Sequence, residues 1–92
     1  MLVKCFLRNG TDDYRTNVLR VNKTIEIEFE NDFKLMSYIK ALQKLSSYDI
    51  TVVAAESNNA TYLWNEDKQS WARKIGKNCS VFNFTMEQWD NI

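Results

Sequence analysis

Residues 30–48, ENDFKLMSYIKALQKLSSY, decide the fold, because they form the only segment of this chain with clear helical periodicity. Asn31 and Asp32 can cap the start of a helix, since their short side chains accept a hydrogen bond from a free backbone N–H. At about 100° per residue, the apolar side chains gather on one arc, with one more at its flank: Leu35, Tyr38, Ile39, Leu42 and Leu45, flanked by Met36. This pattern predicts an amphipathic helix that is anchored on an apolar surface by Ile39 and Leu42.

Three strands are predicted before the helix: Leu2–Arg8, Tyr14–Val21 and Thr24–Glu30. The first has apolar residues on both faces, which indicates a central strand. The third alternates strictly between apolar and acidic residues: Ile25, Ile27 and Phe29 against Glu26, Glu28 and Glu30. One side of this strand is therefore expected to face the core and the other to carry a row of carboxylates. Phe33 lies off the helical arc and is expected to pack back against this strand.

A hairpin is predicted after the helix. Ile50–Ala55 is a nearly continuous apolar run, which is typical of a strand buried on both faces. Thr61–Trp64 and Ser70–Ile75 then flank a polar turn, and a four-residue turn there would place Tyr62 opposite Trp71 as a cross-strand aromatic pair.

The end of the chain is expected to combine a strand with a helical turn. Ser80–Phe84 is predicted as the last strand. Thr85–Gln88 matches a capping box, so Trp89 is expected on a short closing helical turn.

Together these elements predict an α+β fold. We expect a mainly antiparallel sheet of five to six strands, one principal amphipathic helix in the order βββ-α-βββ, and the short C-terminal helical turn. The 92 residues, 1–92, are expected to form a single domain.

The composition excludes several classes of function. Twelve Lys and Arg balance twelve Asp and Glu, so the formal net charge is zero, whereas a dedicated binder of duplex nucleic acid usually has a positive excess. The chain has no His, which is the commonest general base and metal ligand. Its two glycines, Gly10 and Gly76, are isolated and form no phosphate-binding loop.

The remaining reactive residues do not indicate a catalytic or metal site. Cys5 and Cys79 lack a metal-type spacing and are expected to be reduced thiols. The glutamates of the third strand lie in a row and do not converge on one atom. We therefore expect a protein that is not an enzyme and that uses no cofactor and no metal.

The sequence also bears on location. No apolar run approaches the roughly 18 residues of a membrane span, and residues 1–4 have no signal-peptide layout. These features favour a cytoplasmic protein that does not act at a membrane. Many Asn, Lys and Ile residues without Pro or His are typical of A/T-rich genes, as in small phage proteins. A phage-encoded protein of this kind would act in the host-cell cytoplasm.

The first candidate binding surface is the acidic strand and its extension: Glu26, Glu28, Glu30 and Asp32. An ordinary solvated face explains this alternation. Alternatively, the carboxylates dock a basic partner surface, where charges steer association and fix register.

The second candidate surface is the hairpin, which combines aromatic and basic residues: Tyr62, Trp64, Lys68, Trp71, Arg73, Lys74 and Lys77. Stacking aromatics beside cations suit single-stranded nucleic acid such as RNA, and equally a protein–protein hot spot. Alternatively, Tyr62 and Trp71 simply pack in the core.

Net neutrality favours a protein partner over nucleic acid. The sequence therefore predicts a small protein-binding module, of the type of a phage accessory inhibitor or adaptor, that docks on a host or defence protein, for example a nucleic-acid-binding complex. The alternative is binding of single-stranded RNA by the hairpin. A homodimer would form if a strand such as Tyr14–Val21 or Ser80–Phe84 paired at a sheet edge across a two-fold axis.

Overall fold

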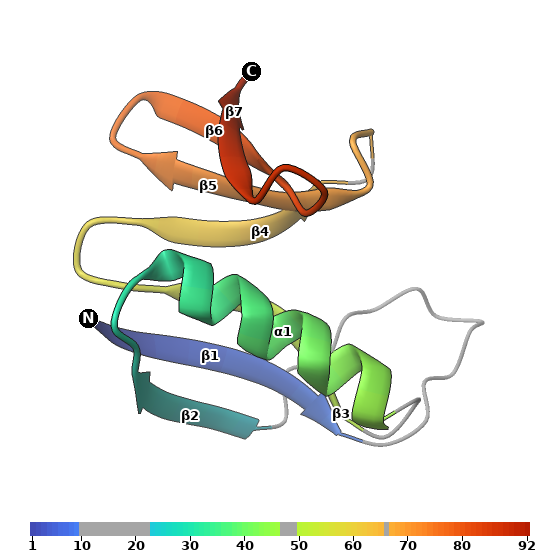
Figure 1. Ribbon diagram of the computed structural model, residues 1–92. Helices are drawn as coiled ribbons and strands as arrows, with labels where there is room; N and C mark the ends of the chain where they lie inside the picture. The colour runs from blue at the N-terminus through green and yellow to red at the C-terminus, as the bar shows by residue number, and fades with distance from the viewer. Residues whose placement is uncertain (10–22, 47–49, 66) are drawn as a thin grey trace.

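The computed structural model describes residues 1–9, 23–46, 50–65 and 67–92. These residues form one helix and seven strands: β1 (Leu2–Asn9), β2 (Lys23–Glu28), α1 (Asp32–Ser46), β3 (Ile50–Glu56), β4 (Thr61–Asn65), β5 (Ser70–Ile75), β6 (Asn78–Asn83) and β7 (Gln88–Asn91). All neighbouring strands pair antiparallel in one sheet of order β2-β1-β3-β4-β5-β6-β7. The helix crosses one face of the sheet (Figure 1). The predicted α+β class and antiparallel sheet are confirmed.

The start of α1 follows from its sequence. The Lys34 N–H donates to Asn31 Oδ1 at 3.1 Å, so Asn31 is the N-cap. Leu35, Met36 and Ile39 are fully buried. Tyr38 and Leu42 are only partly buried, so the predicted anchor Leu42 lies nearer the end of the packed surface than its centre. The Leu45 side chain lies outside the described part of the chain.

The expectation for Phe33 is wrong. Its side chain is 44% exposed, and its ring packs edge-on against Phe82 of β6 at 5.9 Å. Phe33 is the second residue of α1, in the first helical turn, and its side chain lies toward the C-terminal strands and not back at β2. Phe29 instead packs on Tyr38, with ring centroids 5.5 Å apart.

The N-terminal strands agree with the sequence pattern. On β1, Val3, Cys5 and Leu7 are buried, whereas Leu2 is exposed, and the strand lies between β2 and β3 as a central strand should. On β2, the isoleucines are partly buried and Glu26 and Glu28 are exposed. The predicted strand at Tyr14–Val21 lies outside the described residues.

β3 was predicted to be buried on both faces, and the structure differs. The register between β1 and β3 shifts between Phe6 and Leu7, so Val53 has no direct partner. Val52 and Ala55 are buried, but Ala54 is only partly covered, so β3 is not buried on both faces.

The hairpin of β4 and β5 has a different register from the predicted one. Asn65 Oδ1 accepts the Lys68 N–H at 3.0 Å, and Gln69 has a φ of 52°, so the turn lies one residue later than expected. Trp64 therefore pairs with Trp71, and Tyr62 pairs with Arg73.

The C-terminal helical turn is replaced by a strand. Asn83 Oδ1 accepts the N–H groups of Thr85 and Met86, both at 3.0 Å, and Glu87 has a φ of 52°. This geometry reverses the chain and lets β7 pair with β6. The Ser80–Phe84 segment is therefore not at a sheet edge, and the described sheet has seven strands, where five to six were expected.

The second half of the sheet builds an aromatic core. Trp89 of β7 packs on Phe82 and Tyr62, with ring centroids 4.9 and 6.1 Å apart. Trp71 and Tyr62 are each only 1% exposed. Both cysteines are free thiols; Cys5 is buried and Cys79 is exposed.

Candidate binding surfaces

The pairing register assigns each strand side chain to one of two faces. Residues directly opposite each other on antiparallel strands point to the same face, and neighbours along a strand alternate. Val3, Cys5 and Leu7 face α1. Leu2, Lys4 and Phe6 therefore point to the opposite side, which we call the open face, because no helix or strand within residues 1–9, 23–46, 50–65 and 67–92 covers it.

A continuous row of side chains crosses the open face from β2 to β7. Its members are partners in register: Thr24, Phe6, Ala54, Leu63, Ala72, Val81 and Asp90. We call its five apolar members, Phe6 to Val81, the apolar row. Leu63 is 57% exposed. The other four members are half-buried. Single exposed apolar residues are ordinary, whereas contiguous exposed apolar area is a common feature of contact surfaces.

A charged row runs beside the apolar row. It consists of Glu26, Lys4, Glu56, Thr61, Lys74 and Cys79, again in register. Where β2, β1 and β3 meet, Lys4 lies directly opposite both Glu26 and Glu56, and Lys74 lies farther along the row on β5. The apolar row of the open face is therefore flanked on one side by a row of mixed charges.

The acidic edge comprises Glu26, Glu28 and Glu30, all exposed at or just after β2. β2 lies at an edge of the described sheet. The Glu28 carboxylate accepts a hydrogen bond from the Met1 ammonium at 2.5 Å, so part of the negative charge is balanced locally. The predicted exposure of these three carboxylates is confirmed, and their role in binding stays a prediction.

Asp32 does not join the acidic edge. It opens α1 on the opposite side of the sheet, where its Oδ2 accepts a hydrogen bond from Arg73 Nη1. Both side chains are largely buried, at 15% and 21% exposure. The pair joins the helix start to β5 across 41 residues of sequence, so Asp32 is a structural residue of the core side.

The aromatic residues of the hairpin do not form a stacking platform. Tyr62 and Trp71 belong to the core, as the alternative explanation of this surface predicts. The Arg73 guanidinium lies 4.4 Å from the centre of the Trp89 ring and is bound to Asp32. Trp64 remains 42% exposed, but it packs edge-on against Trp71 at 6.2 Å.

The basic residues of the hairpin are also dispersed. Trp64 lies on the α1 side, as its partner Trp71 does, whereas Lys74 pairs with Thr61 and lies on the open face. Lys68 belongs to the β4–β5 turn and Lys77 to the β5–β6 turn. The basic residues of the hairpin surface therefore do not gather beside the exposed Trp64 ring, since Lys74 lies on the other face and Lys77 lies in the next turn.

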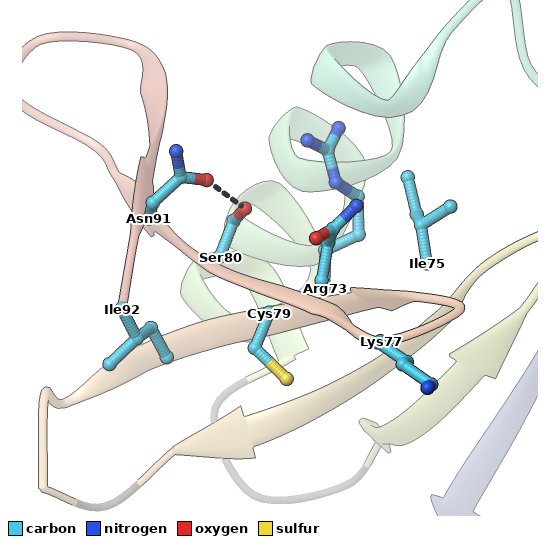
Figure 2. A pocket seen from close by; sticks show the side chains of 8 residues that line it. Arg73, Ile75, Lys77, Cys79, Ser80, Asn91 and Ile92 are labelled. Atoms are coloured by element: carbon cyan, nitrogen blue, oxygen red, sulfur yellow. Dashed lines mark hydrogen bonds between the residues drawn. The ribbon is translucent and has the colours of Figure 1, made fainter.

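A polar hollow of about 440 Å³ lies where β5, β6 and the end of β7 meet. Figure 2 shows Arg73, Lys77 and Cys79 around it, with the Ser80 hydroxyl donating to Asn91 Oδ1 at 3.1 Å. Arg73 is paired with Asp32 through Nη1, and Lys77 is the one other cation among the described residues that line the hollow, so the hollow is a weak anion site at most.

Burial raises the pKa of three described groups, the Cys5 thiol and the hydroxyls of Tyr38 and Tyr62, and none of them is activated. Burial raises the pKa of the Cys5 thiol, so the thiolate that a nucleophile needs is disfavoured. Burial also raises the pKa of the Tyr62 hydroxyl, and the Asp32 carboxylate raises it further. Within the described part of the chain, no three His, Cys, Asp or Glu side chains gather into a metal site.

Sequence reasoning missed the apolar row and the partner of Asp32. The members of the apolar row come from separate strands, and only the register brings them together. The sequence shows that Phe6 alternates with apolar neighbours along β1. It does not show which residues of the neighbouring strands lie beside Phe6.

Comparisons with protein-family models, with curated proteins and with solved structures find no match to this chain. The helix of the described chain is too short and too polar to cross a membrane. Function is therefore inferred from the geometry of the described residues.

Proposed function

We propose that this protein is a small, non-enzymatic binding module that docks on a partner protein through its open face. The observation that carries the proposal is the acidic edge, Glu26, Glu28 and Glu30, exposed beside an apolar row that no described element covers. The fold uses the opposite side of the sheet for its own core, and none of the described elements occupies the open face.

The chemistry of the open face resembles a protein interface. Such interfaces have an apolar centre and a polar rim, and they bury about 800 Å² on each partner. The described residues extend over 34 by 29 by 24 Å, so one face of the sheet is large enough for a contact of that size.

The acidic edge indicates the kind of partner. Exposed charges contribute mainly to association rate and orientation, and they select a surface of opposite sign. A nucleic-acid-binding protein presents a basic surface of this kind. We therefore propose an accessory inhibitor or adaptor of the phage type, which acts in the host cytoplasm and covers a basic surface of a host or defence protein.

Binding of single-stranded RNA through the hairpin is the weaker alternative. Its support is Trp64, which is partly exposed next to the turn that carries Lys68. Stacking of several bases needs several accessible rings, and Tyr62 and Trp71 are buried.

Affinity capture from a bacterial lysate tests the proposal. The wild-type protein, a Glu26→Lys, Glu28→Lys, Glu30→Lys triple variant and Trp64→Ala are immobilised, with and without nuclease treatment of the lysate. We expect a protein that is retained by the wild type and by Trp64→Ala, is lost with the triple variant, and survives nuclease treatment. Circular dichroism first verifies that each variant is folded.

Two results would contradict the proposal. The triple variant could retain the partner as well as the wild type does, which would remove the acidic edge from the site. In the second result, nuclease treatment abolishes capture and Trp64→Ala weakens binding, by about 1–3 kcal/mol per lost stacked base. This result would favour the RNA alternative.

A further inference from the structure

A second surface lies on the helix side of the molecule, away from the open face. α1 and the turn between β6 and β7 enclose a groove of about 580 Å³, which lies within the range of small-ligand and peptide sites. None of the residues that line it belongs to the acidic edge, the apolar row or the hairpin surface.

The floor of the groove is aromatic and held in place. Phe82 contacts Phe33 at 5.9 Å and Phe84 at 4.8 Å, both edge-to-face. Phe82 is only 5% exposed and fixes the arrangement, whereas Phe33 presents 44% of its surface to solvent. A preformed floor of this kind loses little conformational freedom when an apolar side chain binds to it.

The rim of the groove is mostly basic. Lys34 and Lys40 line its α1 side and are exposed, and Lys40 Nζ lies 5.4 Å from the centre of the Phe84 ring. Glu87 is the single acidic residue of the lining. The lining therefore has an excess of positive charge around an apolar floor, opposite in sign to the acidic edge.

We propose that this groove binds a short acidic peptide segment of a partner protein. An aromatic or large aliphatic side chain of the segment packs on Phe33, Phe82 and Phe84, and its flanking carboxylates lie against Lys34 and Lys40. Packing supplies the affinity, because aromatic pairs contribute beyond their buried area, and the lysines select the sign of the flanking charges.

The geometry favours a peptide over a nucleic acid. The three rings stand edge-to-face, at 61° and 88°, and so do not form the parallel surfaces between which a base stacks. The rim carries lysines, which act as point charges, and it has no arginine fork for a phosphate.

An NMR titration tests this site. The probe is a capped pentapeptide of sequence Asp-Asp-Phe-Asp-Asp, added to the ¹⁵N-labelled full chain. We expect saturable shifts of the Ser37, Ala41 and Phe84 amides. A Lys34→Glu, Lys40→Glu variant should lose about tenfold in affinity, since two charge contacts are reversed. The matched control, Lys74→Glu with Lys77→Glu, makes the same charge change outside the groove and should bind within about twofold of wild type.

Several results would overturn the proposal. The groove amides could fail to shift at millimolar peptide, or the variant with reversed lysines could bind as wild type does. A peptide with Lys in place of Asp could bind equally well, or an oligothymidylate could shift the same amides more strongly. The spectrum of each variant also reports whether it is folded. The triple Glu→Lys variant of the acidic edge should still bind the pentapeptide, so failure of this site and failure of the open-face proposal are distinguishable.

Discussion

The two faces of the sheet use the same strands for different purposes. The face toward α1 buries Val3, Cys5 and Trp71 to 1% exposure or less, whereas the open face leaves Leu63 57% exposed. Tyr62 and Leu63 are neighbours in sequence, yet one lies in the core and the other at the surface. Residue parity along a strand therefore decides whether a substitution affects stability or binding.

The largest expected effect is on the α1 face. Trp71→Ala removes a fully buried ring and should cost about 3–5 kcal/mol of unfolding free energy. Trp64→Ala, its partner across the hairpin, loses a partly exposed ring and should cost about 1 kcal/mol. Urea unfolding followed by circular dichroism compares the two. Equal losses would show that the second half of the sheet has no separate aromatic core.

The next effect concerns the ion pair that joins the helix start to β5. Arg73→Ala leaves the Asp32 carboxylate largely buried without its cation, which should cost about 1–3 kcal/mol. The Nε atom of Arg73 is buried and has no acceptor among the described residues, which limits what the pair contributes. A double-mutant cycle with Asp32→Asn measures the coupling. A coupling of zero would mean that the pair does not hold the two segments together.

A pH dependence follows from the buried face. Burial raises the pKa of Cys5 above its ordinary 9.0 and that of Tyr62 above 10.0. Unfolding restores the ordinary values, so at alkaline pH the unfolded state has released protons that the folded state still holds. The contribution of these two groups to stability should therefore be full below about pH 9 and fall as the pH rises.

The control for this pH dependence removes both groups. Melting temperatures between neutral pH and pH 11 should fall less steeply for a Cys5→Ala, Tyr62→Phe variant than for the wild type. A wild-type melting temperature that is constant across this range would show that neither group is protected by folding.

The smallest stability effect is expected on the open face. Leu63→Ser removes apolar area that is already in water and should change the unfolding free energy by about 0.5 kcal/mol or less. The same change should weaken partner capture, because it interrupts the apolar row at its centre. Wild-type capture by this variant would remove the apolar row from the interface.

The sequence predicted those features of the fold that depend on local chemistry. Alternation alone assigned Glu26 and Glu28 to the solvent side, and the Asn31 cap fixed the start of α1. The β4–β5 register could not be predicted from the sequence, since turns at adjacent positions have similar composition and Gln69 adopts a positive φ that its residue type does not favour. Likewise, Thr85–Gln88 matches a capping box, but the side chain of Asn83 makes the segment a turn.

The part of the candidate site that depends on local sequence could be predicted, and the rest could not. The three glutamates of the acidic edge share one strand, so their exposure follows from that strand alone. The partner of Asp32 is 41 residues away, and the apolar row assembles residues of five strands. Both depend on the pairing of distant segments, which no local pattern encodes.

Carboxylate footprinting tests the central claim most directly. The protein is labelled with a carbodiimide and glycine ethyl ester, free and in complex with its captured partner, and each site is quantified by mass spectrometry. We predict that Glu26 and Glu30 are labelled in the free protein and protected in the complex, whereas Asp32, held by Arg73, is poorly labelled in both. Equal labelling of Glu26 and Glu30 in the free and bound protein would contradict docking through the acidic edge of the open face.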